Sequence, residues 1–186
     1  MKTVKPHEAR VFVLILIMSL LVAVIGNALV DDIYKLVYPE KYHSIVSKYA
    51  REFSVPEELV FAIIKVESDF DPKVVSSADA RGLMQMLPST YYWLATKLGD
   101  SNPDEKLLFD PETNIRYGTY YLQYLYSRFG TWEKAIIAYN WGEGNFSEFL
   151  DEEGYASGDY DSIPVKETRN YIKKVMHHWK KYEELY

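Results

Sequence analysis

The chain has 186 residues, no cysteine, and 27 acidic against 21 basic residues, which gives a net charge of −6. This length suits one domain with an extension, and the acidic balance argues against a nucleic-acid partner. The absence of cysteine excludes disulfides, thiol chemistry and cysteine metal sites. The 4 histidines show no metal-ligand spacing, so neither a metal nor another cofactor is expected.

Residues 11 to 30 form an uncharged and almost wholly apolar run. About 20 such residues can cross the hydrocarbon core of a membrane as one helix. Lys2, Lys5 and Arg10 precede the run, which predicts a cytoplasmic flank at residues 1 to 10 and places residues 31 to 186 outside the membrane. The run therefore predicts a single-pass signal anchor, and the alternative is a signal peptide cleaved after Gly26-Asn27-Ala28.

The rest of the chain shows helical patterns and almost no strand signal, which predicts a mainly α domain over residues 31 to 186. Helices are expected at 40–53, 57–68, 88–97, 111–129, 132–139 and from Pro164 to the C-terminus. The expected end signals are a capping box at Ser54-Val55-Pro56-Glu57, the pair Asp110-Pro111, Gly130 and Thr131. Residues 141 to 163 hold four glycines and many acids and are expected to form an irregular loop.

Glu67 is a carboxylic acid on an apolar helix face. Val60, Ile63, Ile64 and Glu67 follow the i, i+3, i+4, i+7 pattern of one helical face. Burial disfavours the charged form of a carboxyl group and raises its pKa, and a carboxyl that stays protonated near neutral pH suits a general acid. The alternative is that Glu67 lies at the rim of this face, where it reaches water or pairs with Arg81.

Five segments carry a family resemblance. Three of them are Glu67-Ser68, Gly82-Leu83-Met84-Gln85-Met86 with Pro88, and Ala138-Tyr139-Asn140-Trp141-Gly142. The other two are Asn114-Ile115 with Gly118, Tyr121 and Leu122, and Glu167-Thr168-Arg169 with Tyr171. In this order and spacing they resemble the signature segments of the soluble lytic transglycosylase (SLT domain) family, whose fold is lysozyme-like. The resemblance covers about residues 40 to 180.

The resemblance implies cleavage of the MurNAc–GlcNAc β-1,4 bond of peptidoglycan without water. In this mechanism Glu67 first protonates the glycosidic oxygen and then accepts the proton of the muramic acid 6-hydroxyl, which closes a 1,6-anhydro ring. The implied partner is the peptidoglycan glycan strand. Together with residues 11–30, the resemblance predicts a monomer on the bacterial cell membrane with its catalytic domain outside the cytoplasm.

Seven further residues are expected to bind substrate because they match the family pattern: Ser76, Met84, Gln85, Tyr139, Asn140, Glu167 and Tyr171. In the family the tyrosine matching Tyr139 hydrogen-bonds the acid, and the glutamate matching Glu167 reaches the cleft. Gly82 would allow the backbone to approach the sugar. Structural roles are the alternatives: turn capping for Ser76, bracing for Gln85 and Asn140, packing beneath the groove for Met84, and an ion pair with Arg169 or Lys174 for Glu167.

Two rival functions follow from the same residues. A hydrolysing muramidase on the same fold would need a second carboxylate. The candidates for this second carboxylate are Asp69, Asp71 and Asp79. The alternative is that they are solvent-exposed charged residues of a loop and have no catalytic role. A non-catalytic glycan-binding module is the other rival. Trp141 departs from the family, which has a small residue at this position, so the shape of a sugar subsite there is uncertain from sequence.

Overall fold

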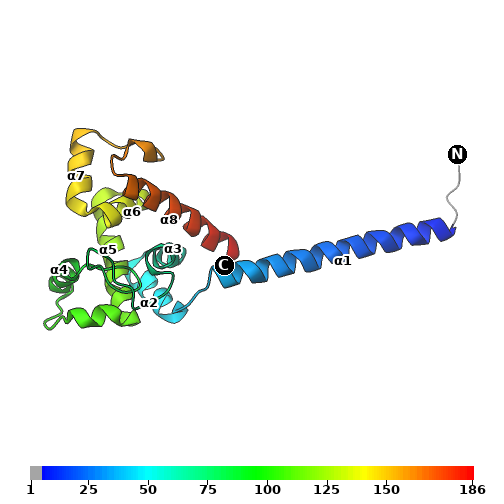
Figure 1. The fold of residues 1–186 in the computed structure, drawn as a ribbon, viewed down its shortest axis with the longest axis horizontal. Helices are drawn as coiled ribbons and strands as arrows, with labels where there is room; N and C mark the ends of the chain where they lie inside the picture. Colours follow the sequence, from blue (N-terminus) through cyan, green and yellow to red (C-terminus); the bar gives the residue numbers. More distant parts are fainter. Residues whose placement is uncertain (1–5) are drawn as a thin grey trace. The chain divides into compact units, whose positions relative to one another are not determined.

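The computed structural model describes residues 6–186, and this part of the chain forms α-helices and two short 3₁₀-helices without a β-strand (Figure 1). The elements are α1 (Pro6–Val37), α2 (His43–Phe53), α3 (Glu57–Ser68), α4 (Pro88–Leu98), η1 (Glu105–Phe109), α5 (Pro111–Phe129), α6 (Trp132–Trp141), α7 (Glu143–Glu152), η2 (Tyr160–Ser162) and α8 (Lys166–Leu185). Two isolated bridges, Val75 to Arg81 and Arg81 to Met86, tie the loop between α3 and α4. The expected mainly α fold is confirmed.

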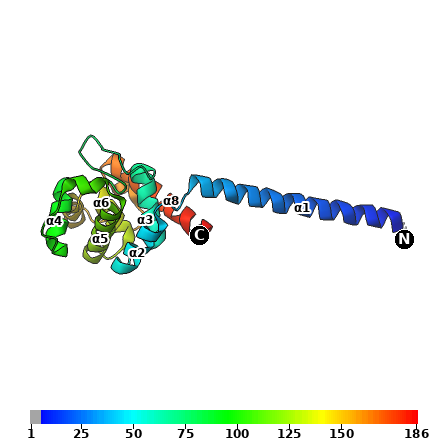
Figure 2. The same cartoon turned by 90° about the horizontal axis from the view of Figure 1, so that it is seen from below.

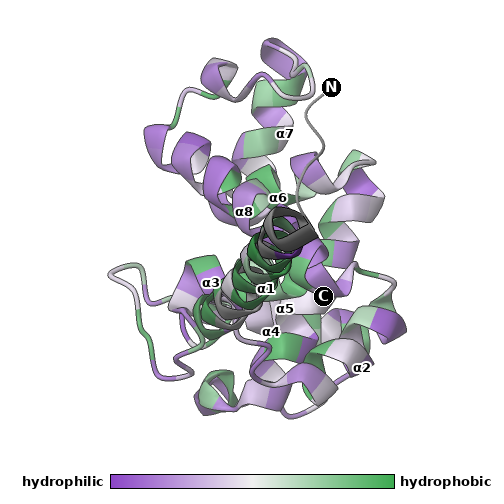
Figure 3. Ribbon diagram, turned by 90° about the vertical axis from the view of Figure 1, so that its right-hand side faces the viewer, coloured by the Kyte–Doolittle hydropathy of each residue, from purple (hydrophilic) through white to green (hydrophobic). Residues whose placement is uncertain are grey.

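The chain divides into two compact units, and the first consists mainly of α1. Residues 11 to 30 are helical, as expected, and Figure 3 shows the apolar character of this helix. The predicted transmembrane anchor is nevertheless not confirmed, since no helix in the described part of the chain is both long and apolar enough to cross a membrane. Lys2 and Lys5, on which the expected orientation rests, lie outside the described residues.

The second unit, residues 40–184 with Tyr186, is a helical domain with α5 at its centre. Helix α5 contacts α2, α4, α6 and η1 (Figure 2). Its buried residues Ile115, Gly118, Leu122 and Leu125 recur at helical spacing, so one stripe of α5 faces the core. This central helix supports the loop that follows α3 and the end of α6, where the site lies.

Most helix ends follow their local signals. Asp110 caps α5 by accepting from the backbone N–H of Thr113, and Gly130 ends it in the left-handed region. Thr131 caps α6 in the same way. The predicted capping box at Ser54 is wrong, because Ser54 already ends α2 in a left-handed conformation, and Pro56, which directly precedes α3, makes no side-chain cap. Only two residues separate Ser54 from α3, so one residue cannot serve both ends.

The loop expected over residues 141–163 is also wrong, because it contains α7. Phe146 and Phe149 lie three residues apart on α7 and are buried, so tertiary packing stabilises the helix. Among the acidic residues and glycines of this segment, two aromatic residues give too short a pattern to predict a helix.

A buried asparagine fixes the loop that carries the Gly82–Met86 segment. The Asn114 side chain accepts from the Met84 N–H at 2.7 Å and donates to the carbonyl oxygens of Arg81 and Leu108. Gly82 has a φ of +76°, and a Cβ at this position would overlap the Leu108 carbonyl oxygen and the Asn114 amide. Gly82 therefore allows the backbone to approach Asn114 closely. The expected approach of this backbone to a sugar stays a prediction.

Candidate active site

Glu67, at the end of α3, lies in a hollow of about 330 Å³. Six of the eight predicted site residues line this hollow, namely Glu67, Ser76, Gln85, Tyr139, Asn140 and Glu167. The other lining residues are Ala78, Ala80, Met86, Leu87, Thr90, Tyr121, Trp141 and Gly142. We refer to it as the Glu67 hollow. The structure thus gathers residues from α3, the following loop, α4, α5, α6 and α8.

The Glu67 carboxyl is partly buried and has one hydrogen-bond donor. The Tyr171 hydroxyl of α8 donates to Glu67 Oε1 at 2.6 Å. Burial raises the pKa of Glu67 to about 7, the bond from Tyr171 opposes this rise, and the negative charge of Glu167 adds to it. A carboxyl with this pKa exists in both protonation states near neutral pH. The alternative pairing with Arg81 is wrong, because Arg81 binds Asp79 and Glu105.

Tyr139 does not hydrogen-bond Glu67, which corrects the expectation from the sequence. Its hydroxyl donates to the Met84 carbonyl oxygen at 2.8 Å and lies 3.5 Å from the Met86 sulfur. The ring still lines the Glu67 hollow. The bond to Glu67 that was expected of Tyr139 is made by Tyr171, whose partner the sequence did not identify. Burial raises the pKa of both tyrosines. Both hydroxyls are therefore neutral donors around neutral pH.

We expect Tyr171→Phe to lower the rate of substrate turnover by about tenfold or more, because a misoriented proton donor weakens transition-state stabilisation. The bond from Tyr171 lowers the pKa of Glu67, so its loss should move the alkaline limb of the pH–rate profile to higher pH. Tyr139→Phe is the matched control, since it removes a hydroxyl beside the same hollow without touching Glu67. An alkaline limb at the same pH in wild type and Tyr171→Phe would contradict this role of Tyr171.

Met84 is not at the surface of the hollow, so its expected substrate contact is wrong. Its side chain is fully buried, and a Cβ added to Gly118 would overlap its sulfur. The small Gly118 of α5 thus makes room for Met84 beneath the site. The backbone of Met84 has the structural role, because its N–H binds Asn114 and its carbonyl oxygen holds Tyr139.

Ser76 and Gln85 brace the loop while lining the hollow. Ser76 Oγ accepts from the N–H groups of Ala78 and Ala80. Ser76 therefore caps a turn, which was the structural role considered beside substrate binding. Gln85 Nε2 donates to the carbonyl oxygens of Val74 and Gly82 at 3.1 and 3.0 Å. These bonds fix the Gln85 side chain and use only its amide nitrogen, so the amide oxygen remains available as an acceptor.

Asn140 has one structural partner as well. Its Oδ1 accepts from the hydroxyl of buried Thr168 at 2.8 Å, which ties the end of α6 to the start of α8. The amide nitrogen is left as a donor at the wall of the hollow. Asn140 can therefore brace the wall and offer a hydrogen bond at the same time.

The three loop acids proposed as a second carboxylate do not line the hollow. Asp69 pairs with Lys65, Asp79 pairs with Arg81, and Asp71 accepts from the Lys73 N–H. Glu167 is the one carboxylate besides Glu67 among the described lining residues. Its alternative ion pair with Arg169 or Lys174 is not formed within the described residues, and Arg169 donates to the carbonyl oxygens of Ile163 and Pro164.

A group with possible metal ligands lies at a different hollow. One ligand atom from each of Glu40, His43 and Glu57 falls within 4.8 Å of the others. His43 Nε2 lies 3.3 Å from Glu57 and 3.9 Å from Glu40, so these residues already form ion pairs when His43 is protonated. Sequence spacing did not reveal this group, because Glu57 comes from a different helix. None of the three lines the Glu67 hollow.

The family model for the transglycosylase SLT domain matches residues 44–161. The chain is 38% identical over 149 residues to the soluble lytic murein transglycosylase of Escherichia coli K12, covering 75% of this chain and 22% of that protein. It is 33% identical over 168 residues to the membrane-bound lytic murein transglycosylase C of Serratia proteamaculans, covering 76% and 46%.

Solved structures show the same similarity. The crystal structure of the 70 kDa soluble lytic transglycosylase of Escherichia coli superposes with a TM-score of 0.76 at 33% identity, over 81% of this chain and 25% of that one. Its complex with bulgecin A gives a TM-score of 0.77. The chain thus spans about a quarter of these longer proteins.

Proposed function

Because this chain belongs to the transglycosylase SLT domain family, we propose that it is a peptidoglycan lytic transglycosylase that cleaves the MurNAc–GlcNAc β-1,4 bond and leaves 1,6-anhydro-MurNAc ends. The observation that carries the proposal is Glu67, a partly buried carboxyl in a hollow, with a pKa of about 7 and a hydroxyl donor at 2.6 Å. The similarity to proteins named lytic murein transglycosylases supports the substrate class.

The reaction uses Glu67 twice. The protonated carboxyl donates its proton to the glycosidic oxygen, the bond from that oxygen to C1 breaks, and positive charge develops at C1. The resulting carboxylate then accepts the proton of the muramic acid 6-hydroxyl, whose oxygen attacks C1 and closes the ring. Glu67 ends protonated, so the cycle needs no water and no cofactor. A pKa near neutrality suits both steps, since neither protonation state is strongly disfavoured.

The surrounding residues have proposed roles in this scheme. Tyr171 holds Glu67 in one rotamer, which makes it a positioning residue. The Gln85 amide oxygen and the Asn140 amide nitrogen offer complementary hydrogen bonds for the acetamido groups of the glycan, and Ser76 and Glu167 line the same hollow. The rings of Tyr139 and Trp141 can pack against sugar rings.

One observation favours a second candidate, a hydrolysing muramidase. Glu167 lines the hollow together with Glu67, and an inverting or retaining glycosidase uses two carboxylates. The products separate the two reactions, because hydrolysis leaves a reducing end.

Digestion of purified peptidoglycan sacculi by the full-length chain tests whether the protein is an enzyme at all. We expect release of soluble muropeptides that increases with time and with enzyme concentration. Sacculi that bind the protein but release no fragments would instead indicate the third candidate, a glycan-binding module.

For localisation, we propose association with the bacterial membrane through α1 and a site of action outside the cytoplasm. Large apolar side chains between Phe12 and Ile25 are exposed on this helix, and one set of relatives carries "membrane-bound" in its name. After cell lysis the full-length chain should sediment with membranes and be released by detergent. Recovery in the supernatant without detergent would contradict the proposal.

A further inference from the structure

Thr168, near the start of α8, is buried, and its hydroxyl binds a residue of the Glu67 hollow. The hydroxyl donates to Asn140 Oδ1 at 2.8 Å. Within the described part of the chain this is the one hydrogen bond of the Thr168 side chain. A buried hydroxyl without an acceptor costs free energy, so the bond to Asn140 satisfies a group that cannot turn to water.

The carbonyl groups that precede Thr168 are bound by Arg169 instead. A threonine hydroxyl at a helix can donate to the carbonyl oxygen four residues earlier, which for Thr168 is that of Pro164. Here Arg169 Nη1 donates to the carbonyl oxygens of Pro164 and Ile163. Thr168 and Arg169 thus divide the acceptors at this helix start, and the proton of the Thr168 hydroxyl goes to Asn140.

This bond decides which end of the Asn140 amide is free. An asparagine side chain has an acceptor oxygen and a donor nitrogen on the same planar group. Thr168 uses the oxygen, and the nitrogen has no hydrogen-bond partner within residues 6–186. This nitrogen is also not enclosed by the protein, whereas the indole nitrogen of Trp179 is. Because Asn140 lines the Glu67 hollow, the hollow presents a hydrogen-bond donor there.

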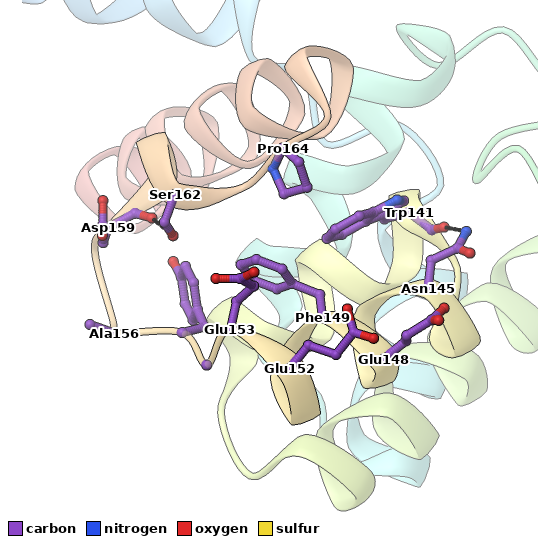
Figure 4. Close-up of a pocket in the computed structure, with 12 residues that line it drawn as sticks. Trp141, Asn145, Glu148, Phe149, Glu152, Glu153, Ala156, Asp159, Ser162 and Pro164 are labelled. Carbon is purple, nitrogen blue, oxygen red and sulfur yellow. Dashed lines mark hydrogen bonds between the residues drawn. The ribbon is translucent and has the colours of Figure 1, made fainter.

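The end of α6 is held by contacts other than the Thr168 bond. The Asn145 side chain donates to the Trp141 carbonyl oxygen at 2.8 Å, which is the dashed line in Figure 4. Trp141 and Pro164 line one cavity (Figure 4), so the end of α6 lies beside the entry to α8. Loss of the Thr168 hydroxyl should therefore release the Asn140 amide and leave its backbone in place.

We propose that Thr168 is a positioning residue that turns the Asn140 amide so that the Glu67 hollow presents a donor to the acetamido carbonyl oxygen of the glycan. The ligand rests on the proposed function, because N-acetylated sugars carry this acceptor. Tyr171, three residues later on the same helical face, holds Glu67 in a similar way. Helix α8 thus positions the proton donor through one hydroxyl and a substrate-binding amide through another.

The orientation of the amide can be measured without any ligand. Hydrogen exchange of the Asn140 side-chain amide protons is followed by NMR in the full-length chain, and Asn140→Asp identifies their signals by removing them. We expect fast exchange, because these protons are open to solvent in the hollow. Slow exchange that becomes fast in Thr168→Val would show that the nitrogen binds Thr168, and would overturn the proposal.

The effect on the ligand is measured by calorimetry in the Glu67→Gln background, which is not expected to cleave it. The ligand is a GlcNAc–MurNAc tetrasaccharide whose lactyl carboxyl groups are amidated, so that it is neutral. Thr168→Val keeps the shape of the side chain without its hydroxyl. We expect it to bind the ligand about three- to tenfold more weakly, the size of one lost hydrogen bond. Equal binding by this variant and its parent would overturn the proposal.

Two variants serve as matched controls. Thr168→Ser keeps the hydroxyl and should restore the binding of the parent. Thr119→Val also removes a buried threonine hydroxyl, and Thr119 lies outside the Glu67 hollow and is not bonded to Asn140. Its binding should equal that of the parent, and a loss as large as in Thr168→Val would overturn the proposal.

Asn140→Asp separates the donor from the connection between α6 and α8. Its carboxylate can still accept from Thr168 but offers the ligand no proton. We expect it to bind about as weakly as Thr168→Val does. Binding as tight as that of the parent would show that Thr168 only connects the two helices, and would overturn the proposal.

The outcome is separable from that of the proposed function. In the active chain Thr168→Val should raise KM and leave kcat nearly unchanged, because Thr168 does not contact Glu67. A parent that bound no glycan would refute the proposed substrate class, and hydrogen exchange would still decide the orientation of the Asn140 amide.

Discussion

Glu67→Gln is expected to abolish glycan cleavage and to leave the fold and most glycan binding intact. The amide keeps the shape of the carboxyl and can still accept from Tyr171, but it cannot transfer a proton. Loss of a positioned general acid lowers the rate by about 10²–10⁴, and here the same group acts in both steps. The measurement is the release of soluble muropeptides from sacculi, with circular dichroism to check the fold. A variant that kept about a tenth or more of the wild-type rate would remove Glu67 from the mechanism.

The same variant has an expected effect on stability against pH. The ordinary pKa of Glu67 is 4.5, and burial raises it to about 7 in the folded protein. Below pH 4.5 the carboxyl is protonated in both the folded and the unfolded state, so its burial does not lower the free energy of unfolding. Between pH 4.5 and 7 the folded state binds more protons, so the free energy of unfolding falls as pH rises. The full cost is present above pH 7.

This cost is at most about 3 kcal/mol, since one pKa unit corresponds to about 1.4 kcal/mol and partial exposure reduces the effect. Glu67→Gln lacks the titrating group, so its melting temperature should fall less than that of wild type between pH 4.5 and 7. If the melting temperatures of the two proteins changed equally with pH over this range, Glu67 would not be buried as described.

Gly82→Ala is expected to cost about 4 kcal/mol or more of stability, or to prevent folding. The added methyl group would overlap the Leu108 backbone and the Asn114 amide, and the φ of +76° is unfavourable for alanine. Gly130→Ala is the matched control, because Gly130 has a φ of +82° and nothing within 4 Å of its added Cβ. This control should lose only about 1 kcal/mol in urea or thermal unfolding.

A similar loss in both variants would mean that the left-handed conformation alone makes Gly82 sensitive. The loss of stability in Gly82→Ala beyond that in Gly130→Ala therefore reports how tightly the loop packs on Asn114. Because Asn114 also holds the backbone of Met84, which accepts from Tyr139, a displaced loop should disturb one wall of the Glu67 hollow.

Local signals predicted the helices whose ends are set by local chemistry. Asp110, Pro111 and Gly130 define α5 through short-range bonds and backbone preferences, so the sequence is sufficient there. Helix α7 depends on the burial of Phe146 and Phe149 against other elements, which the sequence alone does not show. Ser54 carried only the local signal of a helix start, whereas in the fold it ends α2 in the left-handed region.

The sequence predicted which segments form the candidate site better than it predicted which side chains contact one another there. The family pattern named six residues that the fold gathers at one hollow. It assigned the bond to Glu67 to Tyr139, whereas Tyr171, 104 residues away from Glu67 in the chain, makes it. Which of two neighbouring hydroxyls reaches a carboxyl depends on helix position within about 1 Å, and residue spacing does not define distances of this size. Met84 was misplaced for a related reason, since its burial follows from the small Gly118 on another helix.

The mass of the fragment ends tests the central claim most directly. Purified glycan strands are digested to completion by the full-length chain in heavy-oxygen water, and the fragments are analysed by mass spectrometry before and after borohydride reduction. Ring closure by the 6-hydroxyl predicts MurNAc ends that are lighter than reducing ends by one water molecule, contain no heavy oxygen and resist reduction. Reducible MurNAc ends that carry heavy oxygen would show that water is the nucleophile, and would make the protein a muramidase.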